Sequence, residues 1–164
     1  MDARLAMLEE EFDMRWLFWT LLLLSFLFIN ETTVNWLLAV IVCGYGPQSG
    51  FERATQYFTL DSFLFSASFR IIPYIVLSAV ALFSSLKNSA IGKIALYSSL
   101  ATISIFHFWG YWGMQHSLFT PEHTSSTSAL AIIFIPIHAI WLSAVTGTLG
   151  YGLAKVTRLV LNRA

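Results

Sequence analysis

The chain has 164 residues, of which 57% are hydrophobic, 16% aromatic and only 11% charged, and its formal net charge is zero. Soluble domains carry about 25% charged residues, so this composition indicates a membrane protein and excludes an ordinary soluble domain. The nine basic residues form no cluster and give no indication of direct nucleic-acid binding. The single cysteine excludes an internal disulfide framework and a Cys-x-x-Cys redox pair.

Four apolar segments are candidates to cross a bilayer, which takes about 20 residues. They lie at 16–29, 66–86, 94–113 and 128–154. The stretch before the first segment is acidic rather than basic, so we expect that segment to be retained as a span and not removed as a signal peptide. The sequence therefore predicts an all-α, polytopic integral membrane protein with one transmembrane domain of four helices.

A fifth apolar stretch lies at 34–46, within the first long connection, 30–61. It has about a dozen apolar residues, which are too few to span a bilayer comfortably and are typical of an interfacial or re-entrant segment. The Gly and Pro residues of the following GYGPQSG stretch end it. If it were instead a true span, the N-terminus would lie on the opposite side of the membrane.

The distribution of basic residues predicts the orientation. The basic residues close to the ends of the last three spans are Lys87, Lys93, Lys155, Arg158 and Arg163. The connection 114–127 contains no Lys or Arg. Because Lys and Arg gather on the cytoplasmic side, we expect both termini in the cytoplasm and the connections 30–61 and 114–127 outside a bacterial inner membrane.

Two histidines fall inside predicted spans. His138 lies near the middle of the fourth span, two residues after Pro136, and His107 lies in the third. We expect His138 to satisfy a backbone carbonyl that Pro136 leaves without its helical donor, or to hydrogen-bond across helices to His107 or Ser78, and so to stabilise helix packing. A proton or ion path and a bis-histidine haem with one axial ligand from each helix are the alternatives.

Arg70 is the third polar candidate, with apolar residues on both sides. A long guanidinium side chain can snorkel to the outer headgroups. Otherwise Arg70 faces a carboxylate such as Glu31, Glu52 or Asp61, or it lines a water-filled vestibule.

Small residues recur every four positions along the fourth span, in two rows. The rows are Ala139, Ser143 and Gly147, and Thr146, Gly150 and Ala154. Small residues at this spacing allow helix backbones to approach closely, so we predict a helix-packing or homo-oligomer interface here.

The chain shows no Gly-x-Ser-x-Gly and no His-Glu-x-x-His motif. No paired carboxylates fall within the surest apolar segments, and the zinc-ligand spacings are absent as well. We therefore expect no enzyme activity, no catalytic residue, no metal site and no cofactor.

This build, four helices with little mass outside the bilayer, resembles the small membrane subunits of bacterial anti-phage defence operons, such as the membrane partner of the Kiwa system. The resemblance covers topology and no signature residue, so it is an analogy at the level of the fold. It implies a non-catalytic sensor or anchor that works with a separately encoded cytoplasmic protein. The residues that such a partner would contact are Glu9, Glu10, Glu11, Lys155 and Arg158. A subunit of an ion channel or transporter is the alternative.

Overall fold

The structure, a computed structural model, describes residues 16–120 and 130–162. Its helices are, in chain order, Trp16–Phe28, α2 (Glu31–Ile41), α3 (Pro47–Thr55), α4 (Leu60–Phe83), the short 3-10 helix η1 (Ser85–Asn88), α5 (Ala90–His116) and α6 (Ala131–Leu161). Within these ranges there is no β-strand. The predicted contact residues Glu9, Glu10 and Glu11 lie outside the described residues.

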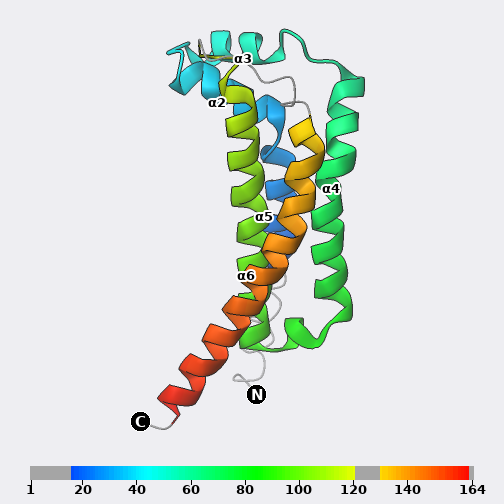
Figure 1. Cartoon of the computed structure of the whole chain (residues 1–164), viewed down its shortest axis with the longest axis vertical. Coiled ribbons are helices and arrows are strands. Elements are labelled where there is room, and N and C mark those ends of the chain that lie inside the picture. The colour runs from blue at the N-terminus through cyan, green and yellow to red at the C-terminus, as the bar shows by residue number, and fades with distance from the viewer. Residues whose placement is uncertain (1–15, 121–129, 163–164) are drawn as a thin grey trace, which may run out of the picture.

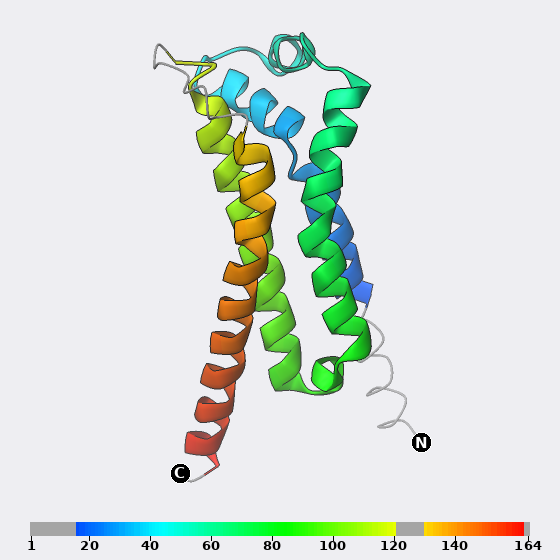
Figure 2. The same cartoon turned by 45° about the vertical axis from the view of Figure 1, so that its right-hand side comes forward.

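The long helices run side by side along the long axis of the molecule (Figures 1 and 2). α2 and α3 lie across one end of this bundle, and η1 turns the chain at the other. The first described helix begins, and α6 ends, at the η1 end. We call the two ends the α2–α3 end and the η1 end.

Three helices, α4, α5 and α6, are long and apolar enough to cross a membrane. The helix Trp16–Phe28 and α2 together pass the same test, but they are bent by 68° at the break between them, so they form either a broken span or a re-entrant loop. Large apolar side chains on the bundle surface are exposed, among them Leu64, Ile75 and Leu149. Such an apolar exterior suits contact with lipid.

Asn30 explains the bend. Its side-chain Nδ2 donates to the Leu27 carbonyl at 2.8 Å, and its Oδ1 accepts from the Thr33 backbone N–H at 2.9 Å. One amide thus satisfies a free carbonyl at the end of the first helix and a free N–H at the start of α2. Most of the predicted interfacial or re-entrant segment 34–46 belongs to α2. The helix ends before Gly44, whose φ of 71° is a backbone conformation that glycine adopts without strain.

The helix bounds differ from the predicted spans at most ends. α4 begins at Leu60 because the Thr59 hydroxyl accepts from the Ser62 N–H at 3.2 Å and caps it. α5 begins at Ala90, since Ser89 caps the Gly92 N–H at 3.0 Å. α6 continues to Leu161, well beyond the predicted end at 154.

The bundle has two apolar cores. The larger one joins the first helix to α4, α5 and α6 through Phe18, Leu77, Leu100, Ile103 and Ala139, among others. The smaller one lies at the α2–α3 end, where Val34 and Leu38 of α2 pack with Tyr111 and Ile135. α2 is therefore packed onto the bundle and closes its end.

Hydroxyl groups add polar links between the helices. Ser25 Oγ in the first helix hydrogen-bonds with Tyr74 Oη at 2.8 Å and with Ser104 Oγ at 2.6 Å. In an apolar environment such bonds help to fix which helices pair.

The α5–α6 pair is the most closely packed. An added Cβ at Gly147 would lie 2.3 Å from Ser99 Oγ, and one at Gly150 would lie 2.8 Å from Ser98 Oγ. Ser99 Oγ donates to the Ser143 carbonyl at 2.9 Å. The structure thus places much of the predicted small-residue rows against α5 of the same chain, and contact within one chain accounts for these residues. A homo-oligomer interface at this place stays a prediction.

Candidate functional site

Arg70 lies inside the bundle. Its side chain is 2% exposed, and its Cζ lies 5.0 Å from the centroid of the Phe26 ring and 5.6 Å from that of Phe63. The guanidinium therefore rests against aromatic rings and does not snorkel to the surface. Its Nε and Nη1 have no hydrogen-bond partner among the described residues. A guanidinium keeps its proton in proteins, so a fixed positive charge is buried here.

Polar groups from α2, α4 and α5 surround this charge. Glu31, at the start of α2, lies within electrostatic range of Arg70 and accepts a hydrogen bond from Ser66 Oγ. Tyr111 Oη lies near Ser66 and Arg70 but meets hydrogen-bond geometry with neither. Of the carboxylates that the sequence offered as partners for Arg70, Glu31 is the one that the structure brings to it. We call Glu31, Ser66, Arg70, His107 and Tyr111 the Arg70 cluster.

His107 completes the cluster on α5. It is fully buried, and its Nδ1 lies 2.8 Å from the Ile103 carbonyl. Because the carbonyl can only accept, Nδ1 carries the proton of the neutral imidazole, and Nε2 carries a lone pair. This Nε2 has no partner in the described part of the chain. The His107 ring neighbours Tyr74 and Tyr111, with ring centroids 5.7 and 5.8 Å away.

Helical spacing brings these groups together. Ser66, Arg70 and Tyr74 follow one another at intervals of four residues along α4, and all three are buried. His107 and Tyr111 have the same spacing on α5. Residues four apart share one helix face, so each helix turns a polar strip inward near the α2–α3 end. Sequence reasoning singled out Arg70 and His107 but missed Ser66 and Tyr111, which this spacing could have identified.

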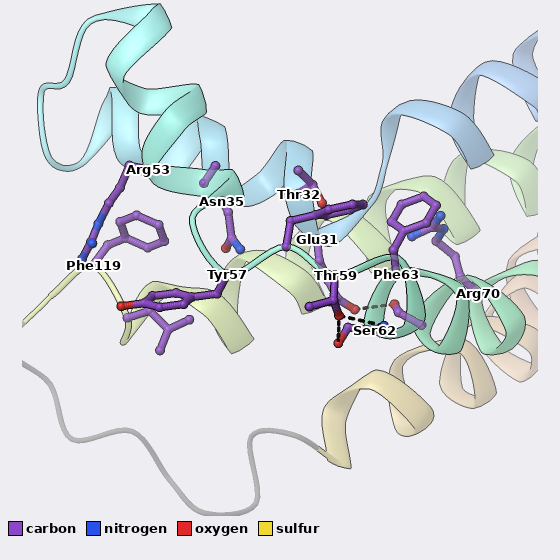
Figure 3. A pocket seen from close by; sticks show the side chains of 14 residues that line it. Glu31, Thr32, Asn35, Arg53, Tyr57, Thr59, Ser62, Phe63, Arg70 and Phe119 are labelled. Carbon is purple, nitrogen blue, oxygen red and sulfur yellow. Dashed lines mark hydrogen bonds between the residues drawn. The ribbon is translucent and has the colours of Figure 1, made fainter.

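A pocket of about 300 Å³ opens beside the cluster, between α2, α3, α4 and the segment after α5. Figure 3 shows Arg53 and Phe119 toward one end of it and Arg70 beside Phe63 at the other. Hydroxyl and amide groups lie between them, from Thr32, Asn35, Tyr57, Thr59 and Ser62, and Ser66 also lines the pocket. Asn35 Oδ1 is a further buried atom without a hydrogen-bond partner in the described ranges.

The cross-helix hydrogen bond expected for His138 is not present in the part of the chain that the structure describes. His138 is exposed on the bundle surface, and its Nδ1 lies 2.8 Å from the carbonyl of Phe134, on its own helix. The buried face of α6 follows Ile135, Ala139 and Ser143, at intervals of four residues, and His138 falls outside this strip. It therefore hydrogen-bonds to neither His107 nor Ser78.

The two histidines do not form a facing pair. His107 is enclosed by tyrosines, whereas His138 lies on the surface among Phe106, Phe134 and Trp141, with ring centroids 6.1 to 6.4 Å away. This arrangement gives no support to a haem held between them. Across residues 16–120 and 130–162, no group of three or more His, Cys, Asp or Glu is placed to hold a metal ion.

Lys155 and Arg158 are exposed on the C-terminal part of α6. This part of the helix runs past η1, beyond the other helices of the bundle (Figures 1 and 2). We call the residues from Leu153 to Leu161 the α6 tail.

Comparison of this chain with protein-family models, with curated proteins and with solved structures finds no match. Two features of the molecule bear on its function. One is the buried positive charge beside a pocket at the α2–α3 end, and the other is the α6 tail at the η1 end.

Proposed function

We propose that this protein is a non-catalytic membrane subunit that anchors, or senses for, a separately encoded cytoplasmic protein, and that the α6 tail is where this partner binds. The observation that carries the proposal is the length of α6. Its 31 residues extend roughly 46 Å at 1.5 Å per residue, whereas the hydrocarbon core of a bilayer is about 30 Å thick. About ten residues of the helix are therefore left over, and α6 runs past η1 at that end.

The chemistry of the tail supports a protein partner. Its large apolar side chains are exposed, with exposed fractions of 69% for Leu153, 58% for Val156 and 69% for Leu161. Lys155 and Arg158 lie among these apolar residues along the tail and add positive charge. A helix with exposed apolar and basic groups fits a groove or a helix that offers apolar and acidic groups.

The orientation belongs to the same proposal. We take the helix Trp16–Phe28 with α2 as the fourth, broken span, which places both termini on one side. Lys87 and Lys93 lie at the η1 turn and the start of α5, close to the end where the α6 tail projects. Basic residues mark the cytoplasmic side, so the η1 end faces the cytoplasm of a bacterial inner membrane and the Arg70 pocket opens on the other side.

The resemblance to membrane partners of anti-phage systems supports a defence role for the assembly, again by analogy of topology. A sensor of this kind would receive its stimulus at the membrane or at the α2–α3 end and pass it to the partner through the helices. Several copies of the chain in one assembly are part of this proposal.

Co-purification from native membranes tests the proposal. The affinity-tagged chain and its Lys155→Glu/Arg158→Glu variant are purified side by side, with Arg53→Glu, at the opposite end, as the matched charge control. We expect one cytoplasmic protein to accompany the native chain and the Arg53→Glu variant and to be lost from the tail variant. Recovery of the same proteins with all three chains would refute the α6 tail as the binding site.

A channel or transporter subunit is the second candidate. Buried polar atoms of Arg70, His107 and Tyr111 that find no partner among residues 16–120 and 130–162 favour it, because buried polar groups of this kind usually hold water or an ion. Conductance of liposomes that contain the purified protein distinguishes the two. An Arg70-dependent current would support the channel, whereas the anchor conducts nothing.

A further inference from the structure

The pocket at the α2–α3 end has an excess of positive charge. Of its lining residues, Arg53 and Arg70 are cationic and Glu31 is the acid. One oxygen of the Glu31 carboxylate already accepts a hydrogen bond from Ser66. Arg70, by contrast, is 2% exposed and belongs to the pocket lining, and its Nε and Nη1 meet no hydrogen-bond partner in the described part of the chain.

A buried charge of this kind is costly unless something pairs with it. Desolvation costs a buried ion several kcal/mol, so buried guanidinium groups normally meet an oxyanion or a full set of acceptors. The contacts to Phe26 and Phe63 lie over the ring faces and do not satisfy the N–H donors. The described part of the chain therefore holds a charged donor that lacks an acceptor.

We propose that the Arg70 pocket binds an oxyanion, which is the carboxylate or phosphate group of a small solute or of a lipid headgroup. Arginine is the side chain best suited to such groups, because its planar guanidinium presents several donors to carboxylate or phosphate oxygens. The volume of about 300 Å³ lies at the lower end of the range for ligand pockets and holds a group of headgroup size.

The remaining lining residues fit the same ligand. Hydroxyl groups of Ser62 and Tyr57 lie between the two arginines as neutral donors, whereas the Thr59 hydroxyl already donates to Ser62 Oγ. The pocket extends from the start of α4, where Thr59 and Ser62 line it, to Arg70, about ten residues along the helix and therefore roughly 15 Å from that start. The start of a spanning helix meets the headgroup region, so a solute or a headgroup reaches the pocket there. The inference goes beyond the proposed function, since this pocket would bind its ligand whether or not the α6 tail recruits a partner.

Calorimetry and thermal unfolding of the purified full chain test the proposal. In lipid-depleted detergent, sodium phosphate and sodium acetate are the probes, and sodium chloride at equal ionic strength is the control. Either probe should bind and raise Tm by several degrees, because a ligand that binds only the folded state stabilises it. Arg70→Lys should weaken binding about tenfold or more, since the compact ammonium cannot reproduce the donor pattern of the guanidinium.

Two further variants distinguish loss of ligand binding from loss of folding and from a general loss of positive charge. Ser62→Trp fills the pocket from an exposed position and leaves Arg70 intact. It should abolish binding while Tm without ligand stays near that of the native chain. Arg158→Gln removes an exposed arginine at the opposite end and should bind the probes as the native chain does.

Nanodiscs separate the two sources of the oxyanion. If the soluble probes bind, the pocket takes a free solute. If they do not, the native chain should have a higher Tm in nanodiscs with phosphatidylglycerol than in phosphatidylcholine alone, and Ser62→Trp should not, which identifies a headgroup. Absence of both effects, or equal binding by Ser62→Trp and the native chain, would overturn the proposal.

Discussion

Glu31, in the first turn of α2, lies within electrostatic range of Arg70, in the middle of α4, and accepts a hydrogen bond from Ser66, one helical turn before Arg70. This relationship ties the helix that closes the end of the bundle to a spanning helix. Glu31 is also the acidic residue of the pocket lining, so its carboxylate can act as the counter-ion of the buried guanidinium.

A double-mutant cycle should detect this coupling. Glu31→Gln removes the countercharge and should destabilise the fold, because Arg70 is then buried without a carboxylate nearby. In an Arg70→Met background the same change should cost less, with a coupling free energy of about 1 kcal/mol. Thermal or denaturant unfolding in detergent measures the four proteins. Strictly additive effects would show that the two charges do not interact.

The close approach of α5 and α6 predicts a contrast between two glycines of α6. Gly147→Leu should lower the free energy of unfolding by about 1–3 kcal/mol, because its side chain would overlap Ser99. Gly152→Leu is the matched control, since an added Cβ there meets nothing within 4 Å. Equal tolerance of both changes would contradict the α5–α6 contact described above.

The two intramembrane histidines should respond differently to truncation. His107→Ala leaves a cavity in the fully buried site beside Tyr74 and Tyr111 and should cost about 2 kcal/mol or more. His138→Ala removes an exposed ring whose hydrogen bond, in the described part of the chain, goes to a carbonyl of its own helix, and it should change stability by about 0.5 kcal/mol or less. A larger loss for His138→Ala would indicate that this ring is covered by a second copy of the chain.

The positions of these residues show which features of the fold and the site can be predicted from the sequence. Apolar content and basic residues predicted membrane-spanning helices and brought out Arg70 and His107 as embedded polar groups. The sequence could also have predicted that the Arg70 side chain points into the bundle, because Ser66 and Tyr74 share its helix face. The outward direction of His138 follows in the same way from the buried strip through Ala139.

Other features depend on contacts between distant segments. Apolar windows mark where lipid contact ends and not where a helix ends, so the extension of α6 to Leu161 was missed, although Lys and Arg are good helix formers. The small residues around Gly147 predict close packing but do not say whether α5 or a second copy provides the contact. The pocket beside Arg70 needs α2 folded back by its Asn30 cap, which periodicity alone does not reveal.

The native cysteine provides a test of orientation. Cys43 is exposed at the α2–α3 end, and we expect a membrane-impermeant maleimide to label it from the periplasmic side of spheroplasts. In a Cys43→Ser background, Asn88→Cys at the η1 end should be labelled only after the membrane is opened. The reverse pattern would invert the proposed topology and place the α6 tail outside the cell.

Photocrosslinking from the α6 tail tests the central claim most directly. A photoreactive amino acid at Leu159, 52% exposed in the tail, is compared in native membranes with one at Leu64, 54% exposed near the start of α4. We predict that Leu159 crosslinks to one cytoplasmic protein, that Lys155→Glu/Arg158→Glu abolishes the crosslink, and that Leu64 does not form it. Crosslinks from Leu159 to lipid alone, with no protein adduct in native membranes, would contradict the anchor function.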